Sequence, residues 1–201
     1  MQYFNGALNF FRQKSGLEFY CNYLLSKEPK DFDYFNKWIQ KPESRKALHV
    51  GNRKFDGASI RVYDDLYDDM FKSVKPWIED LLDADYKVCQ HHHTVSKYFS
   101  SLSLSPKVMF YSGQLDVIIP YPATEKFINH LQWKGAKEYS TAARRIWKVR
   151  DEVAGYARQV RNFRQVMVRN AGHILPYDQP VWAFDMIMRF VEGKSFGDSS
   201  S

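Results

Sequence analysis

The chain has 201 residues, enough to bury one sizeable core, and 44% hydrophobic with 16% aromatic residues is a globular composition. It contains no apolar run of the length that a transmembrane helix needs, and Met1-Gln-Tyr-Phe-Asn-Gly6 has neither the basic nor the apolar region of a secretory signal peptide. Two cysteines, Cys21 and Cys89, are too few for a disulfide framework.

The net charge is +6, from 29 basic and 23 acidic residues, and much of the excess lies between Lys134 and Arg169. A nucleic-acid-binding face would explain such an excess, but no nucleic-acid-binding motif accompanies it. We therefore interpret this region as the solvated surface of a basic protein, and we expect neither a nucleic acid nor a membrane as partner.

The first third of the chain predicts several short helices and no strand. Helical spacing of apolar residues, or a proline in the first turn, marks segments 5–14, 32–40, 42–48 and 72–83. Glycine and asparagine clusters separate these pieces. They are typical of a helical excursion that covers another part of the protein.

From Val108 onward the pattern changes to strands alternating with helices. Val108-Met-Phe-Tyr111 is a short apolar run closed by Gly113, which is typical of a strand buried on both faces of a parallel sheet. Helices are predicted for 122–133, which has a proline near its start, and for 140–149, which would be basic on its outer face.

The last part of the chain predicts a strand pair and a final helix. Residues 155–160 alternate like a strand and pair with 165–169 across the turn at 161–163. Pro180 opens the last helix and Gly193 ends it. The tail, residues 197–201, is disordered by composition.

An aspartate and a histidine follow two of the predicted strands. Asp116 lies just beyond the first strand and its turn, and His173 follows the strand 165–169. Functional groups of open α/β sheets lie just past the carboxyl ends of strands. In this chain order they are the last two members of a Ser–Asp–His triad, in which the carboxylate orients the imidazole that carries the proton. Taken singly, each residue would be an ordinary turn carboxylate or a structural imidazole.

One segment, 88–107, does not fit this pattern. Its triplet His91-His92-His93 suggests zinc, but adjacent side chains point in different directions and no second ligand cluster accompanies them, so we expect no metal site. Removing the segment joins Tyr86-Lys87 directly to Val108 in one unbroken strand. Its ends also back-translate to a splice donor and to a pyrimidine-rich tract before AG. We hypothesise that it is a retained intron translated in frame.

Two strings carry a family resemblance, Tyr111-Ser-Gly-Gln-Leu-Asp116 and Gly172-His-Ile-Leu-Pro-Tyr-Asp-Gln-Pro180. They resemble the serine carboxypeptidases, in particular the vitellogenic-like and retinoid-inducible branch, and segments 73–82, 133–139 and 152–158 are similar as well. The resemblance implies fold class α/β, with the whole chain as the C-terminal portion of one α/β-hydrolase domain. Residues 1–70 would be largely cap or lid helices on its N-terminal side.

The resemblance also implies an activity and a site. Single residues would be removed from peptide C-termini through an acyl-enzyme, with peptide C-termini as partners and without metal or cofactor. Asp116 matches the triad Asp and His173 the triad His, while Ile174 would line the pocket for the leaving residue. The parent protein would be secreted or lysosomal.

The chain departs from the family at the nucleophile. Family members carry a Gly-Glu-Ser-Tyr-Ala-Gly elbow well before the Asp string, whereas Gly57-Ala-Ser59 and Gly193-Lys-Ser195 lack the flanking strand, turn and helix. We therefore expect a fragment that keeps Asp and His but not Ser, and that is inactive alone. Two alternatives stay open: a non-catalytic peptide-binding or decoy protein derived from a carboxypeptidase, and a basic nucleic-acid binder.

Overall fold

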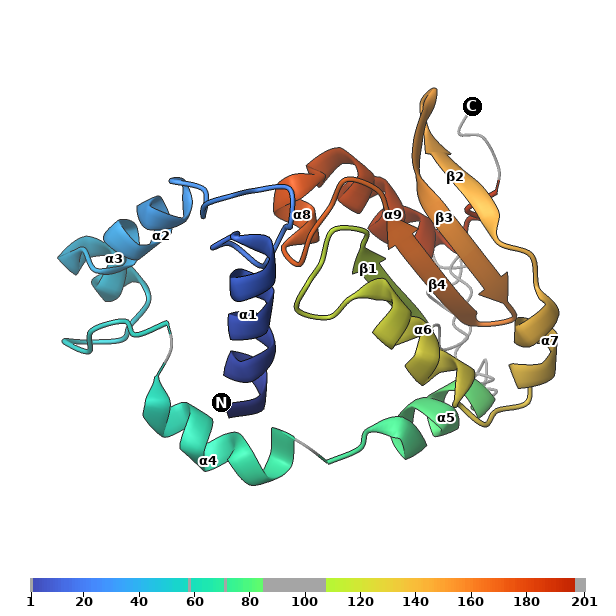
Figure 1. Cartoon of the computed structure of the whole chain (residues 1–201), viewed down its shortest axis with the longest axis horizontal. Coiled ribbons are helices and arrows are strands. Elements are labelled where there is room, and N and C mark those ends of the chain that lie inside the picture. The colour runs from blue at the N-terminus through green and yellow to red at the C-terminus, as the bar shows by residue number, and fades with distance from the viewer. Residues whose placement is uncertain (1, 58, 71, 85–107, 198–201) are drawn as a thin grey trace, which may run out of the picture. The chain divides into compact units, whose positions relative to one another are not determined.

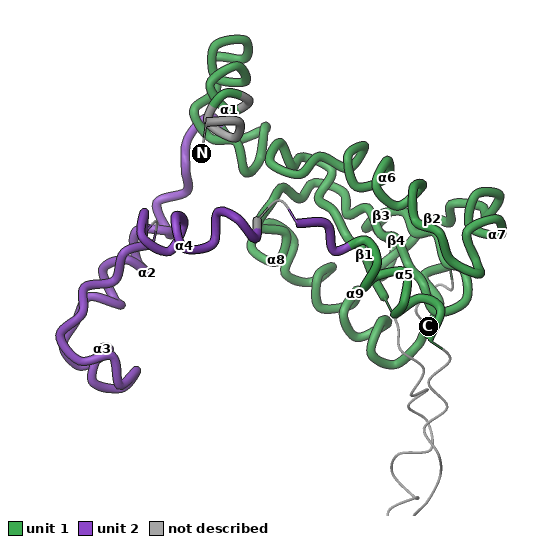
Figure 2. The backbone as a smooth tube through the Cα atoms, turned by 90° about the horizontal axis from the view of Figure 1, so that it is seen from below, with its two compact units in different colours: residues 1–25, 75–201 green, residues 26–74 purple. Residues whose placement is uncertain are grey.

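The computed structural model describes residues 2–57, 59–70, 72–84 and 108–197. The chain divides into two compact units, one made of residues 1–25 and 75–201 and the other of residues 26–74 (Figure 2). The candidate site residues Asp116, His173 and Ile174 all lie in the first unit.

The smaller unit is helical in its described part. It contains α2 (Phe32–Ile39), α3 (Pro42–Ala47) and α4 (Ile60–Met70). The side chain of Gln40 donates to the carbonyl of Phe55 at 2.8 Å and accepts from its N–H at 3.3 Å, which ties the chain after α3 back to the end of α2. The helices predicted for 32–40 and 42–48 are confirmed by α2 and α3, α4 was not predicted, and the cap role of residues 1–70 stays a prediction.

The larger unit is built on a four-stranded mixed sheet (Figure 1). The strands, in spatial order, are β1 (Val108–Gly113), β4 (Phe163–Val168), β3 (Glu152–Val160) and β2 (Arg145–Val149). β1 runs parallel to β4, whereas β3 runs antiparallel to both β4 and β2. The parallel register places Gly113 opposite Val168, so the two strands end side by side.

Helices cover this sheet and enclose two hydrophobic cores. They are α5 (Lys75–Asp83), α6 (Tyr121–Asn129), α7 (Ala136–Thr141), α8 (Leu175–Asp178) and α9 (Pro180–Glu192), and the unit also contains α1 (Gln2–Ser15). Phe163 is fully buried in one core, among side chains of α5, α6 and α7. Trp147 and Val166 are fully buried in the other, with residues of α9. Alternate residues of the strands supply the two cores, as the two-residue period of a strand requires.

The strand pair β3–β4 and the last helix agree with the sequence predictions. The strands meet across a tight turn in which Arg161 adopts a positive φ of 51°. α9 begins at Pro180 and ends at Gly193, whose φ of 75° is the left-handed conformation that glycine adopts at helix ends. The helix predicted for 122–133 is shorter than expected, because α6 ends at Asn129.

The prediction of a helix over 140–149 is wrong. α7 ends at Thr141, and residues 145–149 form β2, paired antiparallel with β3. The segment alternates: Trp147 and Val149 are buried, whereas Lys148 between them is exposed. Lys148, one of the basic residues that suggested a solvated helix face, instead occupies an outward position of an edge strand.

Burial on both faces holds for one of the two parallel strands only. β4 is buried along nearly its whole length. β1 is not, since Tyr111 is 48% exposed and residues 108–110 are half-buried. Met109 packs against one core and Phe110 against the other, so both faces of β1 are only partly covered, and within the described residues β1 pairs with β4 alone.

Several predictions fall outside the described residues. The proposed insert 88–107, with its histidine triplet, and most of the tail belong to this group. The zinc and retained-intron hypotheses therefore remain untested by the structure. Gly197, the first residue of the tail, is described, and its N–H donates to Oγ of Ser195 at 3.1 Å.

Candidate active site

The position of Asp116 follows from the end of β1. After Gly113 the chain turns, and the N–H of Leu115 donates to the carbonyl of Ala171 at 2.8 Å, which fixes the turn against the chain that leaves β4. Asp116 is 9% exposed. Its Oδ1 accepts hydrogen bonds from the N–H groups of Ile118 at 2.8 Å and Ile119 at 3.0 Å, so the backbone holds one carboxylate oxygen in place.

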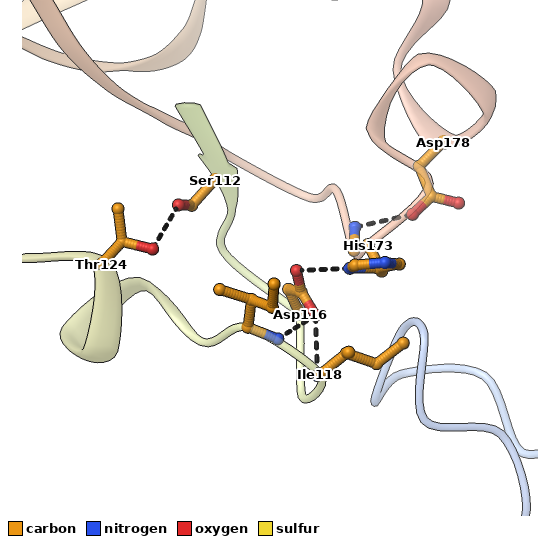
Figure 3. Close-up of polar contacts among 8 residues, drawn as sticks. Ser112, Asp116, Ile118, Thr124, His173 and Asp178 are labelled. Carbon is orange, nitrogen blue, oxygen red and sulfur yellow. Dashed lines mark hydrogen bonds and ion pairs between the residues drawn. The ribbon is translucent and has the colours of Figure 1, made fainter. Parts of the chain in front are cut away.

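His173 reaches the same point from the end of β4. The chain leaves this strand through Asn170, whose φ of 52° turns it toward the β1 loop. Nδ1 of His173 lies 3.0 Å from Oδ2 of Asp116 (Figure 3). The His173 side chain is 38% exposed, whereas that of Asp116 is 7% exposed. The structure thus brings together the two residues that the sequence singled out.

Two glycines allow the loops to approach this closely. A Cβ on Gly113 would lie 2.3 Å from the carbonyl oxygens of Ala171 and Gly172. A Cβ on Gly172 would lie 2.0 Å from the carbonyl oxygen of Cys21. In both cases the obstacle is backbone, which cannot move aside as a flexible side chain does. The short distance between the side chains of Asp116 and His173 therefore depends on glycine at these two positions.

Asp116 and His173 have the donor and acceptor arrangement of an acid–base catalyst. A carboxylate accepts hydrogen bonds only, so Nδ1 of His173 carries the proton toward Asp116 and Nε2 is left as the basic nitrogen. Among the described residues, Nε2 has no hydrogen-bond partner. An imidazole held in this way can take a proton from a hydroxyl group that is brought to Nε2.

A cavity of about 470 Å³ borders the pair. Asp116 and His173 contribute to its wall, and most of the remaining wall is apolar, from side chains of β1, α6 and α8. Its largest apolar lining residues are Phe110, Tyr111, Ile119, Phe127 and Leu175. Within the described lining, the acid–imidazole pair supplies all of the titratable groups apart from the Tyr111 phenol.

Ile174 lies next to the pair, at the start of α8. It precedes α8 as its N-terminal cap, and its carbonyl accepts hydrogen bonds from Tyr177 at 2.9 Å and Asp178 at 3.2 Å. Its side chain is 38% exposed, and the described lining of this cavity includes Ile119 and Leu175 but not Ile174. A role of Ile174 in the pocket for the leaving residue stays a prediction.

One serine does lie in the cavity wall. Ser112 precedes Gly113 on β1 and is 7% exposed. Its Oγ donates to Oγ1 of Thr124 at 3.3 Å and makes no contact with His173 (Figure 3). It is a strand residue that faces α6, not a residue on a sharp strand-to-helix turn.

At the level of sequence, Gly193-Lys-Ser195 was set aside without its second glycine, but Gly193-Lys-Ser-Phe-Gly197 is a complete Gly-x-Ser-x-Gly string. Its structure is not that of a nucleophile elbow. The string follows a helix, α9, and Ser195 accepts a hydrogen bond from Arg189 at its carbonyl and from Gly197 at its Oγ. Ser195 lines a small pocket with residues of β2 and β3, and that pocket shares no residue with the cavity beside His173.

Two polar residues beside the pair were not predicted. Oδ2 of Asp178 accepts hydrogen bonds from the N–H of Gly172 at 2.6 Å and from Nδ2 of Asn22 at 3.0 Å. Asp178 lies in a string that carries the family resemblance, but nothing in the string assigns it a partner. Asn22 precedes it by 156 residues and has no local signal in the sequence.

The described residues contain no group of three or more metal-ligating side chains that could hold an ion. No helix in the described part of the chain combines the length and the apolar character needed to cross a bilayer.

A parallel strand pair that presents Asp and then His at its carboxyl ends is the arrangement of α/β hydrolases. A solved structure that resembles the chain agrees: the prohormone-processing carboxypeptidase Kex1Δp from Saccharomyces cerevisiae superposes with a TM-score of 0.65 over 85% of this chain and 35% of that chain. At 20% identity this likeness concerns the fold alone.

The family is given by sequence. The family model "Serine carboxypeptidase" matches residues 13–92 and 89–193, two pieces that overlap inside the segment 88–107. The "Probable serine carboxypeptidase CPVL" of Pongo abelii is 41% identical over 192 residues, covering 94% of this chain and 36% of the relative. The "Venom serine carboxypeptidase" of Apis mellifera is 40% identical over 92% of this chain and 36% of the relative.

The "Vitellogenic carboxypeptidase" of Aedes aegypti is 35% identical over 92% of this chain, again covering 36% of the relative. The chain belongs to the serine carboxypeptidase family. It spans about a third of the length of the curated relatives that it matches.

Proposed function

We propose that this chain supplies the aspartate and the histidine of a serine carboxypeptidase active site. The observation that carries the proposal is the 3.0 Å hydrogen bond between Asp116 and His173, with Nε2 of His173 left without a partner in the described residues beside a cavity. The names of the relatives support the class of reaction, the release of residues from peptide C-termini.

In this mechanism a seryl Oγ attacks the carbonyl carbon of the last peptide bond while its proton passes to Nε2 of His173. The tetrahedral species then expels the C-terminal amino acid, whose amine takes that proton from the imidazole. Water attacks the acyl-enzyme by the same route, which releases the shortened peptide and restores the serine. Asp116 keeps Nδ1 protonated and stabilises the imidazolium that forms twice in each cycle.

The serine is the part that the described residues do not bring to His173. Ser112 is bonded to Thr124, and Ser195 lies at the other pocket. We therefore propose that the 201 residues alone do not hydrolyse peptides and that the remainder of a carboxypeptidase domain must supply the nucleophile. This same observation favours a second candidate function, a non-catalytic protein that binds peptides through the cavity.

A secreted or lysosomal location forms part of the proposal. It is supported by the relatives, one of which is named as a venom protein.

A graft tests the proposal and separates the two candidates. This chain replaces the matching third of the Pongo abelii relative, to which it is 41% identical, so that the relative supplies the rest of the domain. We expect the graft to release the C-terminal residue of a blocked dipeptide, and His173→Ala to abolish that release. The chain by itself should show no turnover.

A graft that folds but is inactive would contradict the catalytic proposal. Binding of blocked dipeptides by the chain itself would then support the non-catalytic one. Turnover by the isolated chain, lost on Ser195→Ala or Ser112→Ala, would instead show that one of these serines is the nucleophile.

A further inference from the structure

A short segment, Cys21–Tyr23, contacts both loops of the candidate active site. The carbonyl of Cys21 accepts from the N–H of His173 at 2.6 Å, and the N–H of Tyr23 donates to the carbonyl of Leu115 at 3.2 Å. One segment therefore holds the residue before Asp116 and the histidine itself. All of these residues lie in the larger compact unit.

Asn22, the middle residue of this segment, uses both ends of its amide. Its Oδ1 accepts from the N–H of Leu24 at 3.1 Å, and its Nδ2 donates to Oδ2 of Asp178 at 3.0 Å. Asn22 is 7% exposed, so that water does not readily replace either partner. A buried amide with both ends bonded fixes its neighbours more tightly than an exposed one does.

Asp178 connects this amide to the backbone just before the histidine. The same Oδ2 accepts from the N–H of Gly172 at 2.6 Å (Figure 3). The two donors converge on a charged oxygen, which makes both hydrogen bonds stronger than neutral ones. Because Gly172 carries no Cβ, its backbone can enter the narrow space between Cys21 and Asn22.

We propose that Asp178 is a positioning residue which, through Gly172 and Asn22, holds His173 at hydrogen-bond distance from Asp116. It does not touch the imidazole. It fixes the peptide unit between Ala171 and Gly172, while Cys21 fixes the next unit through the N–H of His173. With Asp178 removed, the His173 loop loses a charged anchor and the buried N–H groups that it satisfied are left without an acceptor.

The inference rests on the proposed function, because a residue that positions His173 has a role only if His173 is catalytic. Its test, however, does not require turnover. Isotope-edited NMR of the 201-residue chain follows the Nδ1 proton of His173, assigned as the signal that His173→Gln removes. The proton is protected from exchange with water while it is bonded to Asp116. The indole N–H of Trp147, which donates to Asp185 at 2.8 Å, reports in the same experiment whether the sheet is folded.

Asp178→Ala should speed exchange of the His173 proton at least about tenfold, equivalent to ~1.4 kcal/mol, while the Trp147 signal persists. The matched control is Asp151→Asn, which changes an exposed carboxylate in the β2–β3 turn and should leave the exchange rate as it is. An unchanged rate in a folded Asp178→Ala chain would overturn the proposal.

An exchange of partners keeps the test decisive even where the alanine variant does not fold. Asn22→Asp alone sets two carboxylates against each other, and Asp178→Asn alone sets two amides together, so each should speed exchange. Combined, the two changes restore a carboxylate–amide pair, in which the new amide at 178 accepts from Gly172 and donates to position 22. Recovery of slow exchange in the double variant supports positioning, and additive losses contradict it.

A chain with the Trp147 signal and no protected His173 proton, before any substitution, would contradict the proposed function instead. The double variant in the catalytic graft adds a second readout. A positioning role predicts that kcat falls in each single variant and recovers in the double variant, with KM little changed.

Discussion

Oδ2 of Asp116 and Nδ1 of His173 lie 3.0 Å apart although 57 residues separate them in the chain. The parallel pairing of β1 with β4 brings the two residues together, because it ends both strands at the same edge of the sheet. The turns beyond them are then joined by the hydrogen bond from Leu115 to Ala171. The acid–base geometry is thus a consequence of strand register and of two glycine turns.

The first prediction concerns the carboxylate. In the graft, Asp116→Asn should lower kcat by about 10⁴ with KM little changed, because the new amide donates to Nδ1 and forces the proton onto Nε2, where the base is needed. Steady-state release from a blocked dipeptide measures it. Asp151→Asn is the control, and an Asp116→Asn graft with more than about a tenth of the original rate would exclude this role.

The sequence was sufficient to predict the site residues that directly follow the ends of strands. An apolar run followed by Gly113 and Asp116, and a second strand followed by Gly172 and His173, place both groups at one edge of a parallel pair. The order of Asp before His then suggested the reaction. These inferences need only local pattern and a general rule of α/β sheets.

The remaining features depend on contacts that no local pattern records. Asn22 and Asp178 meet across 156 residues, and only the fold brings them together. The period-two burial of β2 was hidden because its exposed positions include the basic residues Arg145 and Lys148, as on a solvated helix, and because Trp147 fits either element. The role of Ile174 in the pocket for the leaving residue rests on the resemblance alone and stays a prediction.

The second prediction concerns a buried charge behind the sheet. Asp185 accepts from Trp147 at 2.8 Å and from Nε of Arg189 at 2.6 Å, and the side chain of Arg189 is only 6% exposed. Asp185→Ala would leave a buried guanidinium without its carboxylate and should cost about 3 kcal/mol of unfolding free energy. Urea denaturation measures it against Asp151→Ala. A loss below about 1 kcal/mol would show that other partners of Arg189 suffice.

The third prediction concerns the segment 88–107. If it is a retained intron, reverse transcription across Lys87–Val108 should give a dominant product that lacks it. Deleting the segment from the graft should also preserve turnover, because Lys87 would then lead directly into β1. The longer transcript as the sole product in every tissue, or a graft inactivated by the deletion, would show that the segment is a genuine part of the protein.

The last prediction is a dependence of stability on pH that arises from Tyr139. This residue is 2% exposed, its hydroxyl donates to Oε1 of Gln165, and burial raises the pKa of its phenol to about 12 against the partial opposing effect of Arg158. In the unfolded chain the phenol ionises near pH 10. Between about pH 10 and 12 the unfolded state therefore releases a proton that the folded state keeps, and the folded state loses stability as the pH rises.

The effect should reach about 2–3 kcal/mol by pH 12 and be absent below pH 10. Tyr139→Phe keeps the ring contact with Phe163, at 5.2 Å between centroids, but has no proton to lose. The stability advantage of the original chain over this variant, from urea midpoints at about pH 8, 10 and 11, should therefore shrink as the pH rises. Tyr111→Phe, at a 48% exposed position, should show no such trend. A constant difference between the original chain and Tyr139→Phe would mean that another group causes the alkaline loss of stability.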